Sequence, residues 1–334
     1  MKKYIFFLVM IFMVLTFLAG YTSQIFAETQ KIQFGYVTAA SETDPYCIAS
    51  TKFADLVKEK TNGKIEIQLF PSGQLGNERD MIEGMQIGTL DAGLITNAPI
   101  SGFVSSFMVL DLPFVFSDAD NAHKTLDGPA GRALLDKLDK IGIKGLAFAE
   151  GGFRHMINNV RPIVKVEDVK GIKFRVMKNP VYIGLFKYLG SNAIPMPWGE
   201  VFTAVQQGVM DGLEIPISVT WSNKYFEVTK YLSLTGHTYS PLVFMVSKGV
   251  WSSLSGDYQK IFLESAIEAA VYERERVKEI EVDLLNKLAE KGMKINEVPD
   301  KKPFQESVKP LYDEFREKIG ADVLELVLEE AGKN

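Results

Sequence analysis

The feature that most constrains this fold is a regular alternation of strand and helix patterns. In the first half of the chain, apolar residues with strand periodicity occupy four segments: 31–37, 64–70, 90–95 and 144–149. Helical patterns separate them: a stripe of Phe53, Leu56 and Val57 that stops at Asn62-Gly63, and patterns at 78–87 and 120–140. Strands that alternate with helices predict a mainly parallel sheet that is covered by helices on both faces.

The same pattern starts again after Gly151-Gly152. Strands are expected at 153–157 and 172–176, and helices at 181–189 and 201–207. A chain of 334 residues also exceeds what one hydrophobic core usually organises. The sequence therefore predicts an α/β protein with two similarly built lobes.

The C-terminal part is predicted to be helical. A continuous helical pattern covers 257–291, and shorter ones cover 304–319 and 322–330. At 1.5 Å per residue the first would be about 50 Å long. Because that is longer than one lobe, we expect this helix either to run across both lobes or to kink.

The N-terminus has the pattern of a signal peptide. Lys2 and Lys3 precede an apolar run at 4–19, and Ala27 provides a small residue for cleavage. Tyr21, not a cysteine, follows Gly20, which argues against a lipid anchor. The sequence predicts export with removal of residues 1–27; an uncleaved membrane anchor is the alternative.

Composition excludes several functional classes. The single cysteine, Cys47, excludes an internal disulfide and any multi-cysteine metal site. The chain has 37 Lys and Arg residues and 42 Asp and Glu residues, so it lacks the excess of basic residues typical of nucleic-acid-binding proteins. Residues 1–27 contain two lysines and no acidic residue, so their removal changes the net charge from −5 to −7.

Catalytic and cofactor motifs are absent from the sequence. It contains no phosphate-binding loop, no nucleophile elbow, no zinc-protease motif and no calcium loop. We therefore expect neither a cofactor nor a metal. A hydrolase that uses two carboxylates stays an alternative, although nothing in the sequence identifies such a pair.

Two arginines on short predicted strands are the candidate binding residues. Arg175 lies between apolar Phe174 and Val176 near the end of a strand, and Arg154 follows Gly151-Gly152. Open α/β sheets bind ligands at the carboxyl ends of their strands, and a guanidinium can bind a carboxylate with two hydrogen bonds. The alternative for each arginine is a structural ion pair with Asp or Glu.

Five segments carry a resemblance to a known family. They are PSGQLG at 71–76, GGFR at 151–154, VKGIKFRV at 169–176, LGSNAIPMP at 189–197 and EVFTAVQQGVMDGLEIP at 200–216. With these motifs, residues 31–320 resemble the extracytoplasmic solute-binding proteins of tripartite ATP-independent periplasmic (TRAP) transporters, the DctP-like family.

The resemblance implies a two-lobed periplasmic-binding-protein fold of type II-like architecture, with hinge strands and a long helix that span both lobes. Lobe I would comprise 28–151 and 240–279, and lobe II 152–239 and 280–334. It further implies a periplasmic receptor, not an enzyme, that delivers an organic acid, such as a C4-dicarboxylate, to the membrane subunits of a sodium-driven permease. An exported ligand sensor with the same site is the alternative.

The resemblance also assigns roles to individual residues. Arg175 would pair with the ligand carboxylate, and Arg154 would contact or support the ligand. Glu78, or Tyr46, would contact the ligand from lobe I, and Trp198 would cover it with an aromatic ring.

Five positions depart from the family pattern, two of them from the pattern of relatives that bind sialic acid. Val37 and Thr96 stand where those proteins have Asn and Glu, and Ile215 stands where many members have Asn. Met177-Lys178 replaces the Pro-Asn or Pro-Ser that often follows Arg-Val. Fewer polar groups would then face the ligand, which predicts a smaller or more apolar acid: a dicarboxylate, a short hydroxy acid, or a branched or aromatic acid.

Overall fold

The computed structural model describes residues 29–333. The predicted signal peptide at 1–27 lies outside these residues. Within 29–333, no helix combines the length and the apolar character that a membrane span requires.

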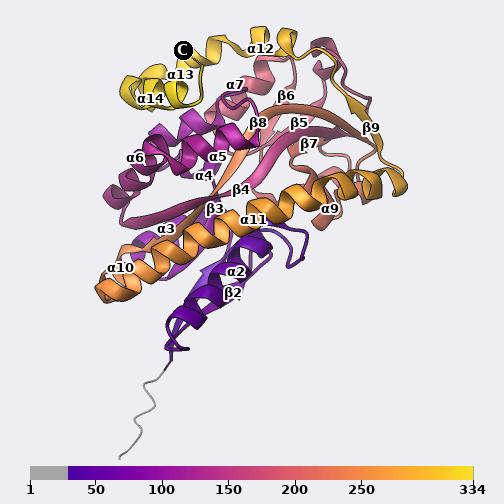
Figure 1. Ribbon diagram of the computed structural model, residues 1–334. Helices are drawn as coiled ribbons and strands as arrows, with labels where there is room; N and C mark the ends of the chain where they lie inside the picture. Colours follow the sequence, from indigo (N-terminus) through magenta and orange to yellow (C-terminus); the bar gives the residue numbers. More distant parts are fainter. Residues whose placement is uncertain (1–28, 334) are drawn as a thin grey trace, which may run out of the picture.

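One mixed sheet of nine strands organises the molecule (Figure 1). The strands are β1 (Gln30–Gly35), β2 (Ile65–Phe70), β3 (Ala92–Thr96), β4 (Ile143–Asn158), β5 (Lys173–Val176), β6 (Asn192–Pro195), β7 (Gly212–Ile215), β8 (Tyr231–Ser247) and β9 (Lys294–Glu297). Their order is β2-β1-β3-β8-β4-β7-β5-β6, and β9 pairs with β8.

The sheet has two halves, as the repeated pattern predicts. In the first half β1 pairs in parallel with β2 and β3, and in the second half β5 pairs in parallel with β6 and β7. The long strands β4 and β8 lie between the halves and pair with each other in antiparallel orientation. This antiparallel centre, which the periodicity did not indicate, makes the sheet mixed.

The two strands expected at 144–149 and 153–157 are a single strand, β4. The pairing register shifts between Glu150 and Gly152, and Gly152 has φ +102°. Glycine adopts this backbone conformation at little cost, so the strand bulges and continues instead of ending. β4 can therefore cross from one half of the sheet to the other.

Helices cover both faces and connect the parallel strands. The longer ones are α2 (Pro45–Lys60), α3 (Glu78–Ile87), α5 (Ala119–Asp127), α6 (Pro129–Lys137), α7 (Pro180–Tyr188), α8 (Trp198–Gln206), α11 (Gly256–Glu290), α13 (Pro310–Ile319) and α14 (Ala321–Glu330). The shorter ones are α4 (Asn97–Ile100), α9 (Ile217–Ser222), α10 (Lys248–Ser253), α12 (Lys302–Val308) and the 3-10 helices η1 (Ser105–Asp111), η2 (Leu138–Ile141), η3 (Val166–Val169) and η4 (Tyr225–Glu227).

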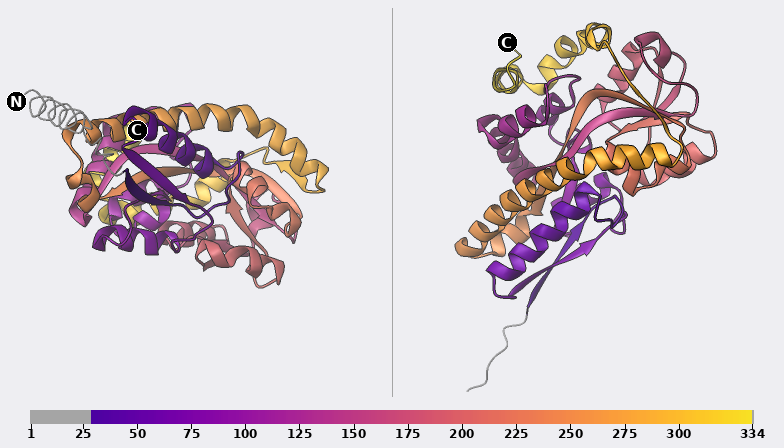
Figure 2. Two further views of the ribbon diagram at one scale, coloured as in Figure 1. Left: turned by 90° about the horizontal axis from the view of Figure 1, so that it is seen from below. Right: turned by 45° about the vertical axis from the view of Figure 1, so that its right-hand side comes forward.

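Helix α11 runs without interruption past both halves of the sheet (Figures 1 and 2). Its 35 residues begin after Ser255, whose side chain accepts a hydrogen bond from Tyr258 N. The helix contacts α2 in the first half, β4 in the centre and α9 in the second half. Of the two expectations for this helix, the uninterrupted run is confirmed.

Proline divides two of the helices that the sequence predicted as continuous. Pro129 begins α6 and separates it from α5, and Pro310 begins α13 and separates it from α12. Proline has no amide hydrogen to donate within a helix, and it disfavours helical geometry in the residue before it.

The C-terminal helices pack on the segment that follows β3. Tyr312 Oη donates to Pro113 O at 2.7 Å, and Ser106 Oγ donates to Ile319 O at 2.9 Å. Residues 280–334, proposed as part of lobe II, therefore also contact residues proposed as lobe I.

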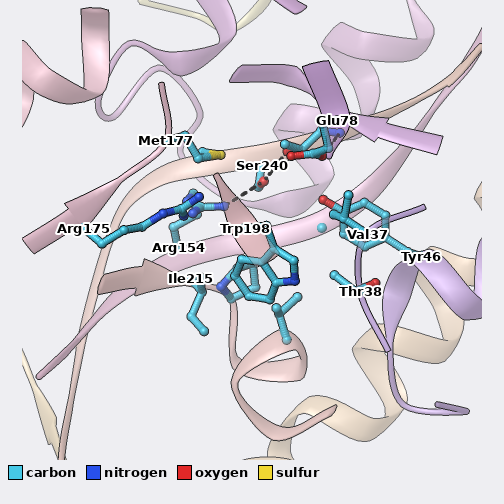
Figure 3. Close-up of a pocket in the computed structure, with 14 residues that line it drawn as sticks. Val37, Thr38, Tyr46, Glu78, Arg154, Arg175, Met177, Trp198, Ile215 and Ser240 are labelled. Atoms are coloured by element: carbon cyan, nitrogen blue, oxygen red, sulfur yellow. Dashed lines mark hydrogen bonds between the residues drawn. The ribbon is translucent and has the colours of Figure 1, made fainter. Parts of the chain in front are cut away.

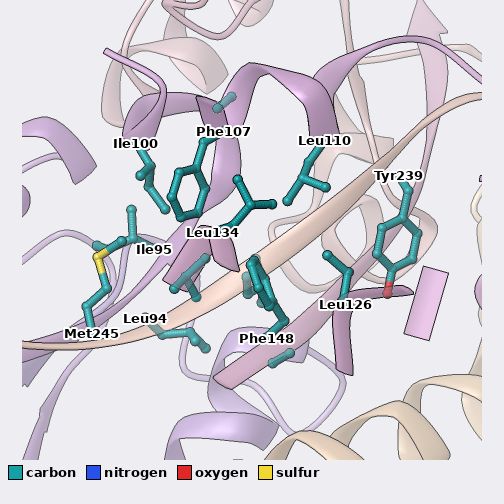
Figure 4. Packing of buried hydrophobic residues seen from close by; sticks show 14 of the residues in the cluster. Leu94, Ile95, Ile100, Phe107, Leu110, Leu126, Leu134, Phe148, Tyr239 and Met245 are labelled. Atoms are coloured by element: carbon teal, nitrogen blue, oxygen red, sulfur yellow. The ribbon is translucent and has the colours of Figure 1, made fainter. Parts of the chain in front are cut away.

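A large apolar core lies where η1, α5 and α6 cover β3, β8 and β4 (Figure 4). Phe107, Leu134 and Phe148 are at most 1% exposed there. Truncating a buried phenylalanine to alanine costs about 3–5 kcal/mol. This packing holds the central strands, and thus the site beside them, in a defined position.

Candidate functional site

A cavity of about 390 Å³ lies at the junction of the two halves (Figure 3). Its walls are Val37, Thr38, Tyr46, Glu78, Thr96, Gly151, Arg154, Arg175, Met177, Trp198, Ile215, Pro216, Val219 and Ser240. All seven residues that the sequence proposed for ligand binding line this one cavity.

The fold explains why these residues meet. Thr96 and Ile215 are the last residues of β3 and β7, while Glu78 and Trp198 are the first residues of α3 and α8. The carboxyl ends of parallel strands and the amino ends of the following helices share one edge of a sheet, and here the edges of the two halves face each other. Amino ends of helices also favour a bound anion.

Arg175 is a buried cation without an ionic partner. It is 3% exposed, and its Nε and Nη2 donate to Met196 O at 2.9 and 2.7 Å. Nη1 makes no hydrogen bond, and no carboxylate among residues 29–333 lies within 4.0 Å of the guanidinium. Burial lowers the pKa of Arg175, because the charge has left water without full compensation. The alternative of a structural ion pair does not describe this arginine.

Arg154, in contrast, is held in an ion pair. Nε contacts Glu214 Oε2, Nη2 donates to Glu214 Oε1 at 2.9 Å, and Nη1 donates to Ser240 Oγ at 3.1 Å. Burial alone would raise the pKa of Glu214, but the adjacent Arg154 and His237 hold it below its usual range. The charge of Arg154 is thus matched by that of Glu214, in contrast to the charge of Arg175.

Glu78 brings a carboxyl group with an unusual pKa to the first-half wall. It is 9% exposed, and its Oε1 accepts a hydrogen bond from Thr96 N at 3.0 Å. Burial raises its pKa to about 7, even though Thr96 N, Arg175 and Arg154 favour the charged form. Near neutral pH, Glu78 can therefore either donate or accept a hydrogen bond.

The remaining lining residues include both polar and apolar side chains. Hydroxyl groups come from Thr38, Tyr46, Thr96 and Ser240, and the Thr96 and Ser240 oxygens lie 3.1 Å apart. Apolar surface comes from Val37, Met177, Trp198, Ile215, Pro216 and Val219. Such a cavity can hold a ligand that presents both hydroxyl and C–H groups.

Sequence reasoning missed Thr38, Ser240 and Glu214 as parts of this site. Ser240 lies on β8 and reaches the cavity only because β8 pairs with β4 beside Gly152. The only sequence signal for these residues was the position of Glu214, which lies within the motif at 200–216 immediately before Ile215. The expectation of few polar groups was based on Val37, Thr96, Ile215 and Met177-Lys178, and it did not include these hydroxyl groups.

A second cavity of about 510 Å³ adjoins the first. Glu78, Arg175, Met177 and Trp198 line both. The second cavity is also lined by Arg79 and by exposed Lys178. Positive charge is therefore present beside the cavity as well as inside it.

The described residues hold no group of three or more His, Cys, Asp or Glu side chains that could bind a metal ion. Cys47, which has no histidine partner, lies in a shallow surface groove with Tyr272 and Arg276.

Known proteins resemble this chain over most of its length. The 2,3-diketo-L-gulonate-binding periplasmic protein YiaO of Escherichia coli is 39% identical over 301 residues, which are 89% of this chain and 91% of that protein. A TRAP periplasmic solute-binding protein from Polaromonas, solved with D-erythronate, has a TM-score of 0.87 and 39% identity, over 90% of this chain and 98% of its own.

A third relative is the sugar acid binding protein DctPAm from Advenella mimigardefordensis, solved in complex with galactonate. It has a TM-score of 0.88 and 37% identity, over 91% of this chain and 98% of its own. The α/β periplasmic-binding-protein fold expected from the sequence is confirmed by both structures.

The family itself follows from residues 34–318, which match the family described as bacterial extracellular solute-binding protein, family 7, or DctP. That match covers most of the chain, and the relatives and the cavity between the two halves agree with it. This chain belongs to the DctP family of TRAP solute-binding proteins.

Proposed function

We propose that this protein is a periplasmic receptor that captures a sugar acid, a polyhydroxy compound with one carboxylate, between the two halves of its sheet. The observation that carries the proposal is Arg175, a buried guanidinium with a free Nη1 and no carboxylate partner within 29–333. Leaving such a charge unpaired is costly, and a ligand carboxylate would compensate it.

A single carboxylate fits the cavity better than two. Arg154 is already paired with Glu214, so Arg175 is the guanidinium left for a ligand. The facing wall carries Glu78, whose pKa of about 7 leaves it partly ionised at neutral pH. A second carboxylate of a C4-dicarboxylate would meet this group and hydroxyls, not a cation. We therefore favour a monocarboxylate over the dicarboxylate that the sequence suggested.

The hydroxyl groups that line the cavity support a hydroxylated ligand. Thr38, Tyr46, Thr96 and Ser240 can exchange hydrogen bonds with ligand hydroxyls, and Trp198 and Ile215 can cover the C–H face. Relatives that bind erythronate, galactonate and diketogulonate support the same class. A short hydroxy acid, one of the ligands expected from the sequence, lies within it.

Membership of a family of solute-binding proteins supports delivery of the ligand to a TRAP permease. We propose that residues 1–27 direct export, that two membrane subunits receive the ligand, and that a sodium gradient drives uptake. We propose no catalytic activity. An exported sensor would use the same site, and genes for membrane subunits beside this one would favour transport.

Calorimetry on the mature protein tests the ligand class. The panel comprises D-erythronate, D-galactonate, D-glucuronate, succinate and L-malate. We expect at least one sugar acid to bind at least tenfold more tightly than either dicarboxylate. Tighter binding of succinate or malate would contradict the proposal, as would no binding of any acid at millimolar concentration.

A further inference from the structure

Asp44 joins the two halves of the sheet beside the ligand cavity. It precedes α2, is fully buried, and uses one carboxylate oxygen for each half. From the first half, Thr38 Oγ1 and Tyr46 N donate to Oδ1 at 2.6 and 3.0 Å. From the second half, Ser222 Oγ and Asn223 Nδ2 donate to Oδ2 at 2.7 and 3.1 Å.

Asn223 adds a second bond across the same junction. Its Oδ1 accepts a hydrogen bond from Ala39 N at 3.2 Å, while its Nδ2 also donates to Val219 O at 3.3 Å. The side chain therefore connects the end of α9 with the loop between β1 and α2. Helices α2 and α9 both pack against α11 but belong to different halves (Figure 1).

Two of the residues bonded to Asp44 also line the ligand cavity, as does Val219, which bonds to Asn223. Thr38 and Tyr46 line it from the first half, and Val219 lines it from α9. The Thr38 hydroxyl donates its hydrogen to Asp44, so its lone pairs are what it can offer to a ligand hydroxyl. Asp44 thus orients the Thr38 hydroxyl, which lines the cavity from the first half, while it accepts hydrogen bonds from Ser222 and Asn223 in the second half.

We propose that Asp44, Ser222 and Asn223 form an interlobe latch that keeps the cleft closed over the bound acid. A rotation that opens the cleft separates α2 from α9 and breaks these bonds. They exist only in the closed form, so they shift the equilibrium toward it and slow ligand release. The latch rests on the proposed function for its ligand, but its bonds involve no ligand-binding arginine.

The chemistry of the cluster suits this role. Hydrogen bonds to an ionised carboxylate are stronger than those between neutral groups. Burial raises the pKa of Asp44 to about 6, a value that Thr38, Ser222, Cys47 N and Asn223 keep from rising further. At pH 7 the group is mostly ionised and accepts bonds from both halves.

Substitution on the α9 side tests the latch without removing the cap of α2. We would combine Ser222→Ala with Asn223→Ala and measure D-galactonate binding by stopped-flow fluorescence and calorimetry. We expect Kd and the dissociation rate to rise at least tenfold, equivalent to about 1.4 kcal/mol, with little change in the association rate. A general structural defect would not raise the dissociation rate while it leaves the association rate nearly unchanged.

The matched control is Ser253→Ala on α10, which also loses a serine hydroxyl bonded to a carbonyl of its own helix, Val250 O at 2.7 Å. It should bind like the unmodified protein. The latch is wrong if the double variant has unchanged Kd and dissociation rate while Arg175→Ala abolishes binding, and the proposed function would then stand.

If the unmodified protein binds none of the panel acids, the proposed function fails and the latch is tested without ligand. Small-angle X-ray scattering should then show a larger radius of gyration for the double variant than for Ser253→Ala. Equal radii would overturn the latch.

Discussion

The Arg175 guanidinium lies over the Trp198 indole, with its central carbon 5.9 Å from the ring centroid. Met196 O accepts hydrogen bonds from Nε and Nη2 of Arg175. The Met196 carbonyl and the Trp198 ring, two residues apart in the chain, therefore both orient the arginine. The ring and the carbonyl leave Nη1 as the free donor. The guanidinium that we propose as the carboxylate-binding group is therefore preorganised, which would lower the entropic cost of binding.

Replacing Arg175 should separate binding from stability. Arg175→Lys places an ammonium where a planar donor pair is needed, and we expect calorimetry to show at least a 100-fold loss of sugar-acid affinity. Arg175→Met removes a buried charge that has no ionic partner, so the ligand-free Tm should be unchanged or higher. Affinity within fivefold of the unmodified protein in either variant would contradict the assigned role.

Replacing Arg154, unlike replacing Arg175, should lower the stability of the ligand-free protein. Arg154→Ala leaves the fully buried Glu214 without its partner, and breaking such a pair costs about 3–5 kcal/mol. Denaturant unfolding of the ligand-free protein should show this loss. Combining Arg154→Met with Glu214→Leu removes both charges and should recover much of the stability; failure to recover any would argue against the ion pair as the cause.

Ligand affinity should weaken as pH rises through about 7. A carboxylate bound at Arg175 masks the positive charge that favours ionised Glu78, so binding raises the pKa of Glu78 above its free value of about 7. Binding then takes up a proton, and by linkage Kd increases with pH, by up to about tenfold per unit. Calorimetry between pH 6 and 8 checks the sign, and Glu78→Gln should flatten the profile.

Lys178 should act on the rate of association. It is exposed on the cavity that adjoins the ligand site, in a chain whose net charge is −5. Lys178→Glu should reduce the association rate several-fold at low salt, with little change in the dissociation rate. The difference should shrink at 0.5 M salt, because screening weakens attraction between exposed charges. A matched change far from the cavity, Lys318→Glu, should leave the rate unchanged.

Local patterns predicted most of the elements. Apolar periodicity identified β2 and α11, because it depends on neighbouring residues in the chain. It did not indicate β6, β8 or β9. The motifs that resemble the family identified seven residues, from Val37 to Ile215, that line one cavity. The strand boundary at Gly151-Gly152 was wrong, because the glycine forms a bulge that the pairing with β8 sustains.

The sequence by itself determined the alternation of strands and helices, the two-fold repetition and the presence of Arg154 and Arg175 on strands. Only the tertiary structure decided which arginine is paired. Glu214 is 60 residues from Arg154 in the chain, and β4 and β7 bring them together while Arg175 is left facing the cavity. Sequence spacing could not reveal this difference, since electrostatic pairing depends on distance in space and on burial, and both are set by how the strands assemble.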